Sequence, residues 1–173
     1  MKIITTIFLI FISTLLFAQG GAMADLKFEE AEIAFNNQDY ETTIKKLDEF
    51  DKLLGSIKDK SLYLRIISQN KLFEPSKLYE NESNFNLLSS LRKNSSAYLK
   101  AMESNGLDER YREVYGISEK IEKYPKDKTA FQLEIKKIND NLDKYVGVYD
   151  SNTNLGAIHI TKDNNRLYIK CYL

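Results

Sequence analysis

The sequence predicts a mostly α-helical protein in which antiparallel helical hairpins stack as an array, followed by a small C-terminal β-hairpin or meander. Two observations carry this prediction. Apolar residues recur at helical spacing in successive pairs of segments between residues 26 and 145. Beyond residue 156 the pattern changes to strict alternation, which is typical of strands. We therefore expect a signal peptide at 1–24, a helical domain at 25–143 and a β appendage at 144–173.

The N-terminal residues have the order of a secretory signal peptide. Lys2 precedes an apolar stretch over residues 3–17, and small residues follow. Cleavage is expected after Ala18 or after Ala24, and retention as a membrane anchor is the alternative. The fifteen residues of the stretch fall short of the roughly 20 needed to span a bilayer. We expect a periplasmic, envelope-associated or secreted protein with no stable membrane span after cleavage.

The first helical pair is the best marked. A helical pattern starts near Leu26 and breaks at residues 36–38, and Asp39 stands where a helix N-cap belongs. Gly55 is placed to end the second helix in the left-handed conformation. The second helix carries one apolar stripe, made of Tyr40, Ile44, Leu47, Phe50, Leu53 and Leu54.

Residues 26–54 resemble one tetratricopeptide repeat. The resemblance rests on Ala31 in the small-residue position of the first helix, the turn at 37–40 with its Asp-Tyr pair, and Ile44 and Leu47 in the second helix. Thr43 and Phe50 depart from positions that are usually small in the family, and no Pro closes the unit. Because one such unit cannot bury both of its faces, the resemblance implies further helical pairs stacked behind it.

Four weaker helical patterns follow. One covers residues 61–73 and stops at Glu74-Pro75. After a polar turn at residues 81–84, a long helix is expected from Phe85 to about residue 105. Asp108 and Asp127 are the expected N-caps of the last two helices. These segments complete three hairpins, although the second and third do not match the first in detail.

The C-terminal segment alternates as strands do. A strand or helix exit is expected at 145–149, a strand at 157–161, a turn at 162–165 and a strand at 166–173. The register of residues 145–149 resembles small β domains that begin Tyr-x-Gly-x-Tyr and are often appended to serine hydrolases. A two- or three-stranded sheet is marginal alone in water, so it should pack on the last helical pair or pair its open edge with something else.

Catalytic, metal and cofactor sites are not expected. His159 is the only imidazole and Cys171 the only thiol, and both stand on predicted strands without an identified partner. Asp150-x-Asn152-x-Asn154 resembles the start of a calcium loop, but Thr161 replaces the closing Glu. The acidic runs, such as residues 48–51, are interleaved with Lys and read as solvated helix faces. The zero formal charge argues against nucleic-acid binding.

The predicted function is binding of a protein or peptide by the surface of the helical array, without catalysis and without a cofactor. Helix-pair stacks form extended concave surfaces, and Tyr suits such surfaces because it is large, rigid and polar at its tip. Two alternatives stay open, an accessory or truncated part of an exported hydrolase and a membrane-tethered structural subunit. The sequence does not predict an oligomeric state. The candidate binding residues are Tyr40, Tyr63, Tyr79, Tyr98 and Tyr111.

Overall fold

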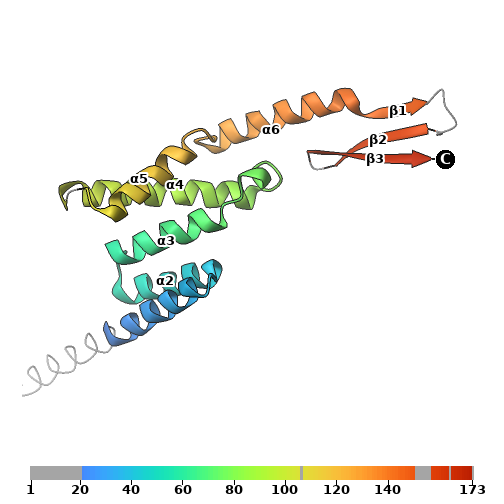
Figure 1. The fold of residues 1–173 in the computed structure, drawn as a ribbon. Coiled ribbons are helices and arrows are strands. Elements are labelled where there is room, and N and C mark those ends of the chain that lie inside the picture. Colours follow the sequence, from blue (N-terminus) through green and yellow to red (C-terminus); the bar gives the residue numbers. More distant parts are fainter. Residues whose placement is uncertain (1–20, 106, 151–156, 164, 173) are drawn as a thin grey trace, which may run out of the picture. The chain divides into compact units, whose positions relative to one another are not determined.

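The computed structural model describes residues 21–105, 107–150, 157–163 and 165–172 (Figure 1). The described chain is mostly α-helical and carries a three-stranded antiparallel sheet near its C-terminus, which confirms the predicted fold class. Most of the expected signal peptide, residues 1–20, lies outside the described residues. Within them, no helix combines the length and the apolar character needed to cross a bilayer.

The chain divides into two compact units. The first unit contains the residues up to Phe73 together with Ser90–Ile121, and the second contains Glu74–Ser89 together with Glu122–Leu173. Helix α4 (Glu82–Met102) therefore contributes its first turns to the second unit and its remainder to the first.

The first unit is helical. A first helix, described over residues 21–36, is followed by α2 (Tyr40–Leu54), α3 (Asp59–Leu72), most of α4, the short η2 (Glu103–Asn105) and α5 (Glu109–Ile121). Helices α2 and α3 pack side by side (Figure 1). The core of this unit is made of apolar side chains that solvent does not reach, among them Ala31, Leu47, Phe50, Ile66, Leu91, Tyr98, Val114 and Ile121.

Helix boundaries fall where the capping residues predict them. The Asp39 carboxylate accepts a hydrogen bond from Thr42 N at 3.1 Å, and Gly55 ends α2 with a φ of 67°. Asp108 accepts from Tyr111 N at 2.7 Å, and Asp127 accepts from Ala130 N at 2.8 Å. These side chains satisfy backbone N–H groups that have no partner inside the helix.

The structure corrects some of the predictions that were made from the sequence. Leu53 belongs to the predicted apolar stripe of the second helix but is exposed, whereas Thr43 is fully buried, with its hydroxyl donating to Asp39 O at 2.8 Å. The polar turn predicted at 81–84 is mostly helix, since α4 begins at Glu82. Asn81 precedes it, and its side-chain oxygen accepts from Asn84 N at 3.0 Å.

The second unit combines a short helical segment, one long helix and the sheet. Its elements are η1 (Pro75–Lys77), the start of α4, α6 (Lys128–Leu142), η3 (Asp143–Tyr145), β1 (Gly147–Asp150), β2 (Ala157–Asp163) and β3 (Arg166–Tyr172). The ring of Phe131 stacks on Phe85 at a centroid distance of 4.3 Å and on Tyr79 at 5.8 Å. This aromatic stack holds α6 against the start of α4.

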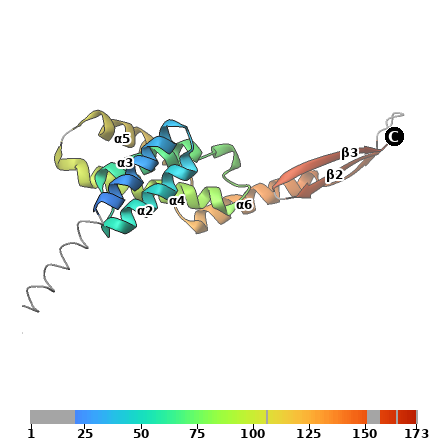
Figure 2. The ribbon, with the colours of Figure 1, turned by 90° about the horizontal axis from the view of Figure 1, so that it is seen from below.

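The sheet has the strand order β1-β2-β3, with β2 in the middle (Figure 1), and Figure 2 shows β2 and β3 side by side. Asn165, with a φ of 62°, turns the chain from β2 into β3, and its side-chain amide donates to Tyr79 O at 2.7 Å. Arg166 pairs with Glu80, and Lys162 pairs with Asp143. The turn between β2 and β3 is therefore tied to the segment that precedes α4.

Candidate functional site

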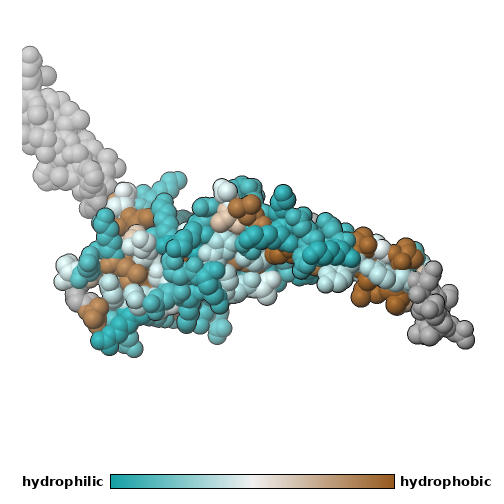
Figure 3. Space-filling view, turned by 90° about the horizontal axis from the view of Figure 1, so that it is seen from above, coloured by the Kyte–Doolittle hydropathy of each residue, from teal (hydrophilic) through white to brown (hydrophobic). Residues whose placement is uncertain are grey.

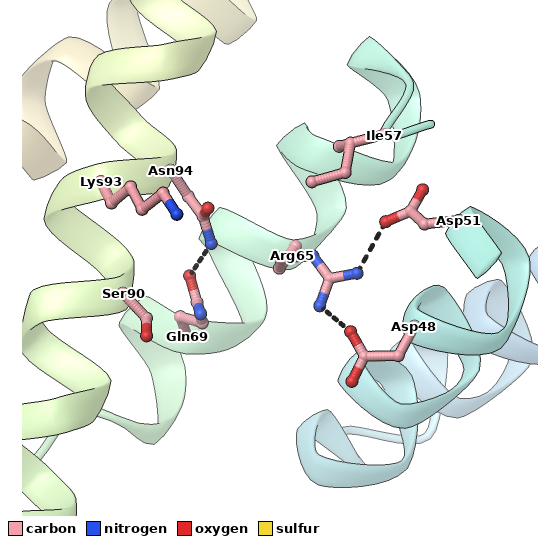
Figure 4. Close-up of a pocket in the computed structure, with 8 residues that line it drawn as sticks. All are labelled: Asp48, Asp51, Ile57, Arg65, Gln69, Ser90, Lys93 and Asn94. Carbon is pink, nitrogen blue, oxygen red and sulfur yellow. Dashed lines mark hydrogen bonds and ion pairs between the residues drawn. The ribbon is translucent and has the colours of Figure 1, made fainter. Parts of the chain in front are cut away.

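Three consecutive helices of the first unit line an open polar cavity of about 320 Å³ (Figure 4). Helix α2 contributes two acids, α3 contributes a guanidinium and an amide, and α4 contributes an amine, a hydroxyl and an amide. We call this cavity the Arg65 groove. Its lining residues are Asp48, Asp51, Ile57, Arg65, Gln69, Ser90, Lys93 and Asn94.

Arg65 organises the acidic side of the groove. Its Nη1 lies 2.5 Å from Asp48 Oδ1 and its Nη2 lies 2.8 Å from Asp51 Oδ2. The Arg65 and Asp51 side chains are 9% and 10% exposed, but that of Asp48 is 66% exposed. Ser61 donates a further hydrogen bond to Asp51 Oδ1 at 2.7 Å. The planar guanidinium thus fixes α2 against α3 with a geometry that a lysine ammonium could not reproduce.

The opposite side of the groove is formed by α4. Asn94 Nδ2 donates to Gln69 Oε1 at 2.9 Å, which ties α4 to α3. Lys93 is exposed and forms no ion pair with any other residue that the structure describes. The groove therefore presents carboxylates along α2 and an amine along α4, with amide and hydroxyl groups between them. None of its lining residues is a His or a Cys.

Tyr63 lines a second cavity of the first unit, of about 350 Å³. The hydroxyl of Tyr63 donates to Glu113 at 2.5 Å, and the Arg110 guanidinium lies 5.1 Å from its ring. Burial, and then the hydrogen bond to Glu113, raise the pKa of Tyr63 to about 12. The phenol is therefore held in its neutral, hydrogen-donating form at any physiological pH.

The structure does not gather the five candidate tyrosines on one face. Tyr63 and Tyr98 contact each other, with ring centroids 5.9 Å apart, but Tyr98 is buried. Tyr111 is half-buried on α5, and Tyr40 packs edge-on against the Phe35 ring at 5.7 Å. Tyr79 belongs to the second unit, in the stack with Phe131. Of the five, Tyr63 is the one that lines a cavity in the first unit.

The acids and the arginine of the Arg65 groove are not predicted by the sequence pattern. The run at 48–51 is typical of a solvated face, but Asp51 is nearly buried and paired. One feature of the sequence could have revealed Arg65 as a functional residue. It is the one charged residue in the run from Leu62 to Ile67, which is otherwise apolar except for the hydroxyl of Tyr63. Two acids three residues apart on the preceding helix provide its partners.

The lone His and Cys lie on the sheet. The His159 ring packs against Tyr172 at a centroid distance of 4.5 Å, and Cys171 is exposed. In the part of the chain that the structure describes, no three His, Cys, Asp or Glu residues are grouped so that they could hold a metal ion. Positions 152 and 154 of the calcium-loop resemblance lie outside that part.

Comparison with known proteins does not assign a family or a function to this chain. No protein-family model, no curated protein and no solved structure matches this chain. The residues that line the cavities are therefore the basis for assigning a function.

Proposed function

We propose that this chain is an exported module that binds a protein or peptide without turnover, and that the helical array provides the binding surface. The observation that carries the proposal is the Arg65 groove, an open cavity that is lined by polar groups from three successive helices. The resemblance of residues 26–54 to a tetratricopeptide repeat supports it, because stacked helical pairs bind along such surfaces.

The chemistry of the groove suits a peptide segment. A peptide backbone carries both donors and acceptors, and the groove offers both through Gln69, Ser90 and Asn94. Its carboxylates on α2 suit a cationic group of the ligand, and Lys93 suits an anionic one. Since the Arg65 guanidinium already holds its two acids in place, little ordering entropy is lost when a ligand binds there.

Export is part of the proposal because of Lys2 and the apolar stretch at 3–17. Mass spectrometry of the protein recovered from its native host measures the mature N-terminus. A mature chain starting at Gln19 or Asp25 is the expected result. An N-terminus that still contains the apolar stretch would contradict cleavage and favour the membrane-tethered alternative.

A displayed library of random octapeptides, selected on the full chain, tests the binding site. We expect two variants, Ser90→Arg and Lys93→Glu, to lower the affinity of a selected peptide several-fold or more. Ser90 is exposed, so an Arg at this position fills the groove. Ser96→Arg, on an exposed position of α4 that does not line the groove, is the matched control and should bind as the parent does.

The same preparations should show no turnover of ester, glycoside or peptide substrates. Turnover that is abolished by one Asp or Glu substitution would overturn binding without catalysis. If the parent, Ser90→Arg and Lys93→Glu proteins bind the peptide with equal affinity, the Arg65 groove is not the binding site.

A further inference from the structure

Strand β3 forms an open edge of the sheet. It pairs with β2 along its whole length, from Arg166 opposite Asp163 to Tyr172 opposite Ala157. No strand pairs with its other edge among the residues that the structure describes. An unpaired edge presents a row of backbone N–H and C=O groups that can pair with another extended chain.

The two faces of the sheet differ in chemistry. Because residues that are paired across strands share a face, the register assigns each side chain of β3 to one of two groups. One group faces the same way as Ile158 and Ile160 and is apolar: Leu167, Ile169 and Cys171. The other faces the same way as His159 and Thr161 and alternates between cation and phenol: Arg166, Tyr168, Lys170 and Tyr172.

The described residues of the second unit leave side chains on both faces of the sheet exposed. Ile169 is 66% exposed, and Tyr168 and Tyr172 are about half exposed. No described residue of the three strands falls in the buried class, and Figure 3 shows hydrophobic residues gathered on the surface of the sheet. A three-stranded sheet with exposed apolar side chains gains stability when a further strand extends it.

The charges along β3 have one sign. Arg166 and Lys170 are the two positively charged residues of β3, and the strand contains no acidic residue. Arg166 is paired with Glu80, whereas Lys170 forms no ion pair with the described residues. Lys170 lines a cavity of about 450 Å³, and four of the other five lining residues also belong to the polar face: His159, Thr161, Tyr168 and Tyr172, with Ile169 as the fifth. An added strand would bring every second side chain to the edge of this cavity.

We propose that the edge of β3 binds an extended peptide segment whose side chains alternate between acidic and apolar residues. A strand that pairs with β3 lies about 4.8 Å away, so its side chains contact those of β3 on each face. Acidic residues on the polar face meet Lys170 and the phenols, and apolar residues on the other face cover Ile169. This site lies in the second unit and does not depend on the Arg65 groove.

The test uses a fluorescent octapeptide of alternating Val and Glu, with anisotropy measured against the full chain. Two control peptides have the same length, one with its Val and Glu residues in separate blocks and one with Lys in place of Glu. We expect the alternating acidic peptide to bind roughly tenfold or more tightly than either control at low salt, and less tightly as salt rises. Backbone amide signals of Arg166–Tyr172 should shift when it binds.

Single substitutions test whether the peptide binds at the edge of β3. Lys170→Glu should weaken the alternating peptide by roughly tenfold, whereas Lys136→Glu, an exposed change on α6, should leave its affinity unchanged. Lys93→Glu, which alters the Arg65 groove, is measured in parallel, and a loss as large as that of Lys170→Glu would place the peptide in the groove and overturn the proposal. Equal binding of the block peptide, no loss in Lys170→Glu, or no detectable binding would overturn the proposal. So would self-association of the chain through β3 that excludes the peptide.

Discussion

The guanidinium of Arg65 lies 2.8 Å from the Asp51 carboxylate and 2.5 Å from that of Asp48, but the two ion pairs have different surroundings. Asp51 is nearly withdrawn from solvent, and Asp48 is two-thirds exposed. A buried charge that loses its partner keeps the cost of its desolvation, whereas an exposed one regains water. The two acids should therefore contribute unequally to stability.

Arg65→Met should lower the free energy of unfolding by about 3 kcal/mol, because it leaves Asp51 unpaired inside the helix interface. Asp48→Asn should lower it by less than about 1 kcal/mol. Urea unfolding followed by circular dichroism measures both. The double change Arg65→Met with Asp51→Leu should recover most of the loss. A larger loss for Asp48→Asn than for Asp51→Asn would contradict this account.

The helices were predictable because their signals are local. Asp39, Asp108 and Asp127 each bind a backbone N–H group three residues later, and Gly55 adopts its left-handed conformation within the same turn. Alternation at 166–172 likewise predicted β3 and the division of its side chains between two faces. Such interactions are completed within a few residues, so spacing in the sequence is enough to reveal them.

The candidate site was less predictable because it depends on contacts between distant residues. Asp51 and Arg65 are 14 residues apart, Gln69 and Asn94 are 25 apart, and their side chains meet only when α2, α3 and α4 pack. The periodic pattern placed Leu53 in the same apolar stripe as Leu47, although only Leu47 is buried. The repeat resemblance at 26–54 and the expected export stay predictions.

Two glycines should respond to alanine in opposite directions. Gly55 ends α2 at a φ of 67°, a region in which a Cβ atom is strained, whereas Gly116 lies inside α5 and a Cβ there would meet nothing within 4 Å. We expect Gly55→Ala to destabilise the protein by about 1 kcal/mol and Gly116→Ala to stabilise it by about 0.5–1 kcal/mol. Thermal and urea unfolding measure both. A stabilising Gly55→Ala would contradict its role as a left-handed cap, and a destabilising Gly116→Ala would contradict the open space at that position.

The aromatic stack around Phe131 should control the stability of the second unit. Phe131 is buried between the Phe85 and Tyr79 rings, so Phe131→Ala should cost about 3–5 kcal/mol. Leu133→Ala, on the exposed side of the same helix, should change stability by less than about 0.5 kcal/mol. Hydrogen exchange should show faster opening of α6 in Phe131→Ala. Equal exchange of α6 in both variants would show that the stack does not hold this helix.

Tyr63 should make the stability of the chain fall at alkaline pH. Its pKa is raised from 10.0 to about 12 in the folded protein, chiefly by burial and then by the hydrogen bond to Glu113. Below pH 10 the phenol is neutral in both the folded and the unfolded chain, so its contribution is fully present there. Between pH 10 and about 12 the unfolded chain releases the proton first, and the contribution is lost.

The measurement is the free energy of unfolding of the parent protein minus that of Tyr63→Phe, taken by urea unfolding at several pH values. We expect this difference to be constant below pH 10 and to decrease as the pH rises towards 12, because the phenyl ring of the variant cannot ionise. Glu113→Gln removes the charged acceptor that helps to keep the phenol protonated. In that variant the pH range over which the difference decreases should therefore end at a lower pH. A difference that is flat across the window would show that Tyr63 ionises equally easily in the folded and the unfolded chain.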